Sequence, residues 1–241
     1  MINLFKGFAL AISMLTTVPM FKIHDFHKGI NGYAVMFYPL VGFILGYALW
    51  GLHSLLNPYV ASTHLAVIIF ALWVLLTGAL HLDGFSDTVD GLYVSKERAL
   101  EVMKDPHVGG MGMIMSVTFL ILKASSLAVF EAFYLLPIVL LLSRLNAVLA
   151  IYFYPYISQN GMGALAKEEF TKPQMLITLF YSFLALLLYN KLLLLVSTLL
   201  VLFVIKSFFI KRYGGFTGDI YGFTIEISEL IILNILLFGL V

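Results

Sequence analysis

The sequence predicts an all-α protein, a polytopic helical bundle embedded in a membrane. Of its 241 residues, 61% are hydrophobic and only 11% are charged, whereas soluble domains carry roughly 25% charged residues. The mean hydropathy is +1.01, and the chain is long enough for about seven spans of about 20 residues with their loops. These observations exclude a water-soluble fold. We expect residues 1–241 to form one integral membrane domain solvated by the lipid bilayer.

Charge and cysteine content exclude several function classes. The 14 basic and 13 acidic residues give a net charge of only +1, which offers no electrostatic footprint for nucleic acid. Cysteine is absent, so disulfides, thiolate metal sites and cysteine nucleophiles are excluded together. A metal ion would have to be held by oxygen or imidazole ligands.

The first apolar stretch runs from Gly7 to Val18, directly after Lys6. Because it is too short to cross a bilayer, it predicts a re-entrant or interfacial helix. The residues that follow, 17–20, lack the small-residue cleavage pattern of a signal peptide. We therefore expect this helix to belong to the mature protein.

Seven further stretches are apolar and nearly free of charge, as expected of membrane spans. They are Tyr33 to Leu52, His64 to Leu80, Gly112 to Phe130, Leu136 to Phe153, Met175 to Tyr189, Leu192 to Phe209 and Tyr221 to Val241. The fifth and sixth are short, so one long tilted helix is the alternative for 175–209. Tyr189-Asn190-Lys191 favours a turn between two helices.

Basic residues predict the orientation of these spans. With seven crossings, the loops 21–32, 81–111, 154–174 and 209–222 lie on one side of the membrane, and the opposite loops hold Lys191 alone. By the positive-inside rule, the four loops face the cytoplasm and the C-terminus lies outside. The nine basic residues of the four loops are Lys22, Lys28, Lys96, Arg98, Lys104, Lys167, Lys172, Lys211 and Arg212.

Three carboxylates follow the second apolar stretch, within the 81–111 loop. Asp83, Asp87 and Asp90 fall at i, i+4 and i+7, which places them on one helical face. Like charges on one face repel, and Mg²⁺ takes carboxylate oxygens and shares its coordination with substrate phosphates. The pattern predicts a Mg²⁺ site, with Gly84 and Gly91 allowing close approach of a ligand or helix. A solvated acidic turn at the membrane edge is the alternative.

A second polar cluster runs from Gly214 to Asp219 and leads into the last apolar stretch. A glycine-rich segment before a helix can present backbone N–H groups to a phosphate, so we expect Gly214, Gly215 and Thr217 to bind substrate. Asp219 is predicted to be catalytic, either completing the metal site or accepting a proton from the attacking hydroxyl.

Two acidic and two basic residues stand out within the predicted spans. A charge at bilayer depth costs roughly 2.5–3.5 kcal/mol on insertion scales, so these side chains should face the bundle interior. Glu226 and Glu229 either bind substrate or form a structural ion pair. Lys123 and Arg144 are candidate counter-charges, and Arg144 could equally hold a phosphate through its planar guanidinium. Both readings stay open.

The polar, glycine-rich segment 104–112 leads into the third span. We expect its Asp105 and His107 to contact substrate, because it lies on the same predicted side as both acidic clusters.

The stretch from His81 to Leu92 resembles the signature of the cobalamin-5′-phosphate synthase family, approximately HLDGLADTxDG. Two departures are visible: Pro106-His107 stands where the family usually has Ser-Arg, and Phe223 where it usually has Ala. Further matches are Phe37-Tyr-Pro39-Leu-Val-Gly42 with Gly46, Lys104-Asp105 with Gly109 and Gly112, Arg144, Gly161-Met-Gly163, and Gly214 to Asp219 with Gly222, Glu226 and Glu229.

The resemblance implies an inner-membrane, Mg²⁺-dependent transferase of cobalamin nucleotide loop assembly. A hydroxyl of α-ribazole or its 5′-phosphate would attack the cobinamide-linked phosphate of adenosylcobinamide-GDP and release GMP. Asp87 and Asp219 would be the catalytic residues. The oligomeric state stays open, a homo-oligomer included.

Two alternatives remain at this point. The segment from Asp87 to Gly91 matches D-x2-D-G, the first half of the CDP-alcohol phosphotransferase motif, but Val94-Ser95 stands where that family has Ala-Arg and no G-x3-D-x3-D follows. A cation-coupled transporter would place its carboxylates near the bilayer midplane on interrupted helices. The acidic cluster expected in the 81–111 loop favours an enzyme.

Overall fold

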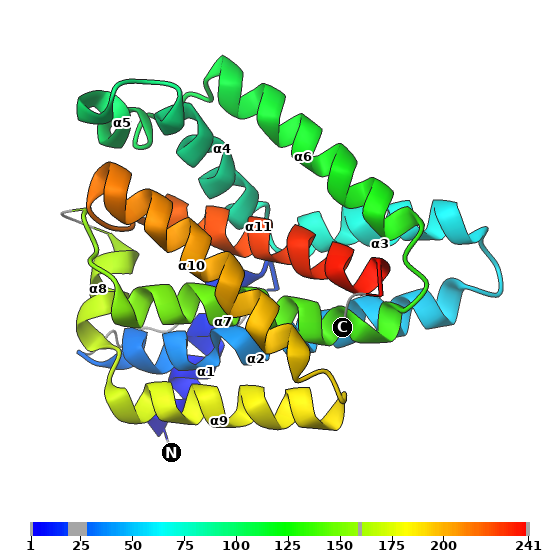
Figure 1. The fold of residues 1–241 in the computed structure, drawn as a ribbon. Helices are drawn as coiled ribbons and strands as arrows, with labels where there is room; N and C mark the ends of the chain where they lie inside the picture. Colours follow the sequence, from blue (N-terminus) through cyan, green and yellow to red (C-terminus); the bar gives the residue numbers. More distant parts are fainter. Residues whose placement is uncertain (1, 19–27, 159–160, 240–241) are drawn as a thin grey trace.

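The computed structural model describes residues 2–18, 28–158 and 161–239, and within these ranges the chain is helical (Figure 1). Their only β pairing is an isolated parallel bridge between Tyr156 and Phe216. In chain order the helices are α1 (Ile2–Leu15), α2 (Ile30–Leu56), α3 (Ser62–Leu76), α4 (Leu80–Leu92), α5 (Lys96–Val102), α6 (Gly110–Ala128), the 3-10 helix η1 (Phe133–Leu135), α7 (Leu136–Phe153), α8 (Met162–Glu169), α9 (Lys172–Leu188), α10 (Leu193–Tyr213) and α11 (Gly218–Leu237).

Helix α7 is the centre of the bundle. Every residue from 135 to 151 is buried, and α2, α9, α10 and α11 all pack on this helix. Gly42 and Gly46 of α2 face it so closely that a Cβ would overlap the backbone of Leu140 and Pro137 respectively. Small residues at this spacing let two membrane helices approach at backbone distance.

The predicted polytopic membrane bundle is confirmed. Five helices are long and apolar enough to span a bilayer: α2, η1 with α7, α6, α10 and α11. Two bent pairs, α3–α4 at 82° and α8–α9 at 94°, bring the number to seven if each counts as one span. Such broken helices supply the spans that neither short partner could make alone.

The segment 175–209 forms two helices, as the turn residues predict. Asn190 adopts a positive φ of 52°, and the Lys191 N–H donates to the Leu186 carbonyl at 3.0 Å. Figure 1 shows α9 and α10 running in opposite directions across the bundle. The single long helix is therefore wrong, because the chain reverses at Asn190.

The N-terminal apolar stretch forms a separate short helix, α1, as expected from its length. It packs along α2, where Gly7 meets Tyr33. Beyond its end, the Thr17 N–H donates to the Leu76 carbonyl at 2.8 Å, which ties α1 to the end of α3. Its placement at a membrane interface stays a prediction.

The expectation that residues 81–111 form a loop is wrong. They comprise α4, α5 and the start of α6, and α4 packs between α11 and α6 inside the bundle. Phe85 and Val89 bury an apolar face of α4 against Phe119 of α6. Positive φ values at Gly78 and Ala79 make the sharp break from α3. The acidic residues thus occupy one face of a packed helix.

Candidate functional site

The two acidic motifs, far apart in the sequence, meet where α4 packs on the start of α11. A Cβ on Gly84 would lie 2.9 Å from the Asp219 carbonyl oxygen, and one on Gly222 would lie 3.0 Å from the His81 carbonyl oxygen. Glycine on both helices therefore permits their backbones to touch. This contact places Asp219, in the first turn of α11, beside the acidic face of α4.

The carboxylates at this contact carry uncompensated negative charge. Asp83 is exposed, while Asp87 and Asp219 are half-buried. Asp83, Asp219 and Asp90 all repel the Asp87 carboxylate. None of these four residues takes part in an ion pair of the described residues. Lys104 is the cation whose charge reaches Asp219, so the cluster as a whole attracts cations.

The carboxylates at this contact are suitable ligands for Mg²⁺, but they do not form a complete set of protein ligands around a metal ion. In the described ranges, no three or more His, Asp or Glu side chains form a ready-made metal site. Mg²⁺ is usually bound through one or two carboxylates together with waters and substrate phosphates. Asp83 and Asp219 fit that mode, because they are accessible and line the cavity described below. Asp87 is half-buried beside them and does not line that cavity.

Asp90 has protein partners that set it apart from the other acidic residues. It is 8% exposed, and its two oxygens accept hydrogen bonds from the N–H groups of Gly109 (2.8 Å) and Gly112 (2.7 Å). A carboxylate at these amides satisfies unpaired donors at the start of α6 and complements the helix dipole. Asp90 thus anchors α6 to α4, a role that differs from the predicted metal ligand.

The C-terminal end of the acidic helix, just beyond Asp90, is also held by α10. Arg212 donates to the Leu92 carbonyl at 2.9 Å and to the Val94 carbonyl at 3.2 Å, and the Tyr213 hydroxyl donates to the Gly91 carbonyl at 2.9 Å. These carbonyls end α4 without partners of their own in the helix. The sequence identified Arg212 only as a basic loop residue.

The segment 214–219 is shaped mainly by contacts within the protein. Gly214 ends α10 with a positive φ of 86°. Gly215 is buried, and a Cβ there would lie 2.5 Å from the Pro155 carbonyl oxygen. The Phe216 N–H donates to that same oxygen at 2.9 Å. Gly215 therefore permits two chain segments to pair, and neither glycine lies on the wall of the cavity described next.

A cavity of about 610 Å³ opens beside the acidic face, within the usual size range of small-molecule sites. Asp83, Lys104 and Asp219 line its accessible end, and the buried Thr217, the N-cap of α11, lines it further in. The closed end is formed by buried side chains, among them His81 and Ile151. The cavity thus joins a charged mouth to a largely apolar interior.

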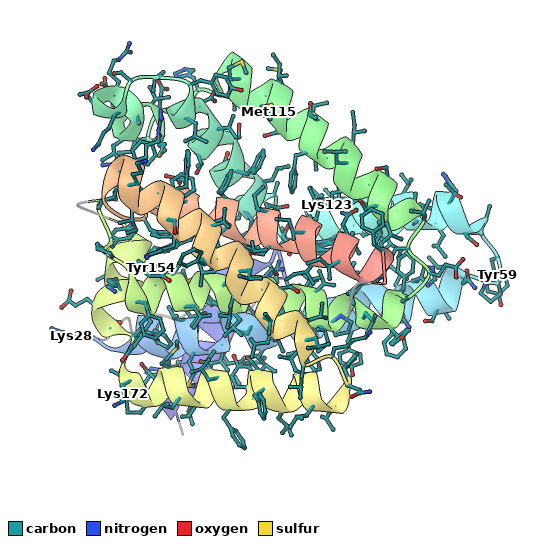
Figure 2. The ribbon with its side chains drawn as sticks, viewed as in Figure 1. Lys28, Tyr59, Met115, Lys123, Tyr154 and Lys172 are labelled. Carbon is teal, nitrogen blue, oxygen red and sulfur yellow. The ribbon has the colours of Figure 1, made fainter. Side chains whose placement is uncertain are left out.

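The buried charges form an ion-pair network in the core. Lys123 of α6, labelled in Figure 2, donates to Glu226 at 2.6 Å and also pairs with Glu229. Arg144 pairs with Glu229 as well, and none of the four side chains is more than 9% exposed. The structural ion pair is therefore present. Arg144, Glu226 and Glu229 do not line the cavity.

Asp105 and His107 lie in the exposed connection between α5 and α6. The His107 N–H donates to Asp105 at 3.0 Å, and the His107 Nδ1 lies 2.7 Å from the same oxygen. These hydrogen bonds lower the pKa of Asp105. Neither residue lines the cavity, whereas the preceding Lys104 does.

Sequence reasoning missed most of the cavity wall, including Lys104, His81, Tyr156 and Tyr221. Lys104 stood next to the predicted Asp105, and His81 began the acidic motif, so adjacency was a usable signal for both. Tyr156 and Tyr221 carry no motif of their own. Only the packing of the 154–158 segment on α11 brings these two rings to the cavity.

Comparisons with known proteins agree with this arrangement. The chain matches the family Cobalamin-5-phosphate synthase over residues 7–237. It is similar to adenosylcobinamide-GDP ribazoletransferases of Thermosynechococcus vestitus (41% identity, covering 81% of this chain and 82% of the relative) and Desulfitobacterium hafniense (34%, 93% of each). The enzyme of that name from Acinetobacter baumannii is 35% identical over 94% of each chain. No solved structure matches the chain. Because the family match spans nearly the whole sequence and these relatives cover most of it, the protein belongs to the cobalamin-5-phosphate synthase family and is a membrane-embedded transferase of cobalamin synthesis.

Proposed function

We propose that this transferase joins α-ribazole, or its 5′-phosphate, to adenosylcobinamide-GDP in a Mg²⁺-dependent reaction. The ribazole hydroxyl oxygen forms a new bond to the cobinamide-linked phosphorus, and the pyrophosphate bond to GMP breaks. The hydroxyl proton passes to solvent at the cavity mouth. The products are GMP and adenosylcobalamin or its 5′-phosphate. The observation that carries the proposal is the meeting of Asp83 and Asp219 on the cavity wall, with Asp87 beside both carboxylates.

The residues at the mouth divide the work of phosphoryl transfer. Asp83, Asp87 and Asp219 would hold Mg²⁺, which shields the pyrophosphate charge and supports the leaving GMP. Lys104, which also lines the cavity, adds a positive charge that reaches Asp219. A base is of less importance here, because a loose transition state needs little early proton removal from the attacking hydroxyl. Asp219 accordingly serves the metal and the orientation of the hydroxyl.

Positioning of this mouth depends on the surrounding helices. Asp90 ties the last turn of α4 to α6, and Arg212 binds carbonyls at the same end of α4, so the C-terminal end of the acidic helix is held by two neighbouring helices. Preorganised groups of this kind lower the reorganisation needed in the transition state. We propose that the predicted phosphate contact of the 214–219 segment is limited to its cavity-lining residues, Thr217 and Gly218.

The mouth is proposed to face the cytoplasm of the inner membrane. The end of α4, the α10–α11 turn and the 154–158 segment lie at the same end of the bundle, on the left in Figure 1. Lys96, Lys104, Lys167 and Arg212 belong to this end. Basic residues concentrate on the cytoplasmic side of membrane proteins.

Family membership, and not the position of the acidic cluster, argues against the transporter alternative. The acidic cluster lies on a broken helix pair, α3–α4, and interrupted helices are typical of transporter sites. Its position therefore no longer separates the two classes. Membership in the synthase family and the transferase names of the relatives support the enzyme.

A reconstituted assay tests the proposal. Full-length protein in detergent micelles would receive adenosylcobinamide-GDP, α-ribazole and Mg²⁺, with GMP and the corrinoid product measured by chromatography. We expect equal amounts of GMP and product, loss of both on chelation of Mg²⁺, and recovery when Mg²⁺ is restored. Failure of the wild-type protein to form product would overturn the proposed reaction. Product formation that persists in chelator would overturn its metal dependence.

A further inference from the structure

Two tyrosine rings form one wall of the cavity. The centroids of Tyr156 and Tyr221 are 6.0 Å apart with an interplanar angle of 23°. Tyr221 stacks in turn on Phe216, at 5.7 Å and 19°, and Phe216 on Tyr154, at 5.5 Å and 16°. A Cβ on Gly163 would lie 2.6 Å from the Tyr156 ring. The wall is thus a packed aromatic stack whose outermost ring, Tyr156, is half-buried and reaches the cavity.

This wall is joined directly to the proposed reaction centre. The Tyr156 hydroxyl interacts with the Gly218 backbone N–H and with the Ser158 side chain. Gly218 precedes Asp219 in the first turn of α11. Burial raises the pKa of Tyr156, so the phenol stays neutral. A flat ligand on Tyr156 would therefore have its substituents next to the acidic mouth.

Two residues that line the cavity carry buried polar atoms without partners among the described residues. Tyr221 is 7% exposed and His81 is 3% exposed, and both line the cavity. The Tyr221 hydroxyl and both His81 ring nitrogens have no hydrogen-bond partner among the described residues. Leaving a buried polar group unpaired is costly, and small-molecule sites present such groups to their ligands.

The remaining interior is apolar and selects among the heterocycles of the reaction. Leu15, Ile151 and Ile225 are buried cavity residues. Guanine presents several donors and acceptors that would go unpaired against such a wall. The dimethylbenzimidazole of ribazole is mostly hydrocarbon and keeps one ring nitrogen as an acceptor. The corrin macrocycle with its side chains is larger than a nucleoside and would stay outside the cavity.

We propose that this cavity binds the base of the nucleoside acceptor. The bicyclic ring packs against Tyr156, and the Tyr221 hydroxyl donates a hydrogen bond to the unsubstituted ring nitrogen. The ribose then lies at the mouth, where its hydroxyl meets the corrinoid phosphate beside Asp83 and Asp219. Tyr156 and Tyr221 are in this sense specificity-determining residues. The inference rests on the proposed function, since it names where one of its two substrates binds.

Direct binding of α-ribazole tests the site without turnover. Calorimetry would use full-length protein carrying Asp87→Asn, which is expected to be inactive, in detergent micelles. Tyr156→Leu should weaken nucleoside binding about tenfold, because base–aromatic stacking is lost. Tyr156→Phe keeps the ring and should stay within about twofold of the parent. Tyr154→Leu removes a ring of the same stack that does not line the cavity and should leave the affinity unchanged.

A ligand lacking the ring nitrogen isolates the hydrogen bond. Tyr221→Phe should weaken α-ribazole binding about fivefold, yet have no effect on the indole riboside, in which carbon replaces that nitrogen. This comparison holds even if Tyr156→Leu does not fold, because Tyr221→Phe changes a single atom. Equal losses for both nucleosides would overturn the hydrogen bond.

Competition with GMP separates this inference from its rival. If Tyr156→Leu weakens GMP binding and leaves α-ribazole binding unchanged, the cavity holds guanine and the inference is wrong. If the wild-type protein turns over but neither tyrosine variant alters the nucleoside KM, the inference fails while the proposed function stands. A wild-type protein that neither binds α-ribazole nor releases GMP would overturn both.

Discussion

Asp87 and Asp90 lie on the same helical face, yet their surroundings give them different tasks. Both oxygens of Asp90 accept hydrogen bonds from amides at the start of α6. Asp87, in contrast, is half-buried beside other carboxylates. Identical side chains three residues apart therefore lead to separate predictions. One concerns turnover and the other concerns folding.

Asp87→Asn should lower kcat by about 100-fold or more, because charge stabilisation by a metal ion is worth several kcal/mol. Insertion should be unchanged and thermal stability should not fall, since this side chain makes no hydrogen bond within the described residues and its neutral form relieves the repulsion by the neighbouring carboxylates. GMP release and the melting temperature in detergent measure the two effects. Near-normal activity with an unaltered Mg²⁺ requirement would remove Asp87 from the metal site.

Asp90→Asn should instead destabilise the protein by about 1–3 kcal/mol. An asparagine offers one acceptor oxygen where two amides need partners, and hydrogen bonds to a charged group are the stronger kind. Denaturation in mixed micelles measures the loss. A variant as stable as the wild type would show that the amides of Gly109 and Gly112 find other partners.

The core ion-pair network leads to a third prediction at the residue scale. Lys123→Met leaves Glu226 without its cation and Glu229 with Arg144 alone, which should cost about 3–5 kcal/mol of stability. Adding Glu226→Gln should recover part of the loss, because it removes the unpaired charge. Lys211→Met, at an exposed position of α10, serves as the control with no expected change. Denaturation in mixed micelles measures the free energy of unfolding of the Lys123→Met, double and Lys211→Met variants.

At the scale of helices, the site exists because α4 and α11 touch. Packed helix axes are usually 8–10 Å apart, set by the side chains between them. Here Gly84 and Gly222 leave no side chain at the contact. The first turn of α11 is therefore brought beside the acidic face. The geometry of the cavity mouth thus depends on two glycines that take no part in the reaction themselves.

Gly84→Val should consequently abolish activity although every acidic residue is intact. Its Cβ would lie 2.9 Å from the Asp219 carbonyl oxygen, so one helix must shift and the carboxylates must separate. Gly51→Ala in α2 is the matched control, because a Cβ there meets nothing within 4 Å, and it should gain about 0.5–1 kcal/mol of stability. Measuring turnover and Mg²⁺ affinity of both variants tests this prediction. An active Gly84→Val would show that the helix contact is dispensable.

At the scale of the whole molecule, the bundle has two chemically different ends. Figure 2 shows Lys28 and Lys172 at one end and Tyr59 at the other. The mouth of the cavity belongs to the lysine end. In the proposed orientation, both substrates would reach the cavity from one compartment while the apolar helices stay in lipid.

Because the chain contains no cysteine, single cysteines can report this orientation. Ser95→Cys and Lys172→Cys should react with an impermeant maleimide only when it is supplied from the cytoplasmic side. Tyr59→Cys, at a residue that is 82% exposed, should react only from the opposite side. Labelling of positions 95 and 59 from the same side would overturn the seven-span arrangement.

Composition and residue order were sufficient for the membrane class, the helical fold, the short N-terminal helix and the turn at Asn190, because each depends on hydropathy and local backbone preference. They also located the acidic motifs, since charge inside an apolar chain is costly and therefore conspicuous. Only the tertiary structure decided what each charged residue contacts. Asp90 meets the start of α6, Arg144 meets Glu229, and Tyr156 meets Gly218 through packing between segments distant in the chain. Helical periodicity specifies the face on which a side chain lies but not the partner that the fold brings to that face.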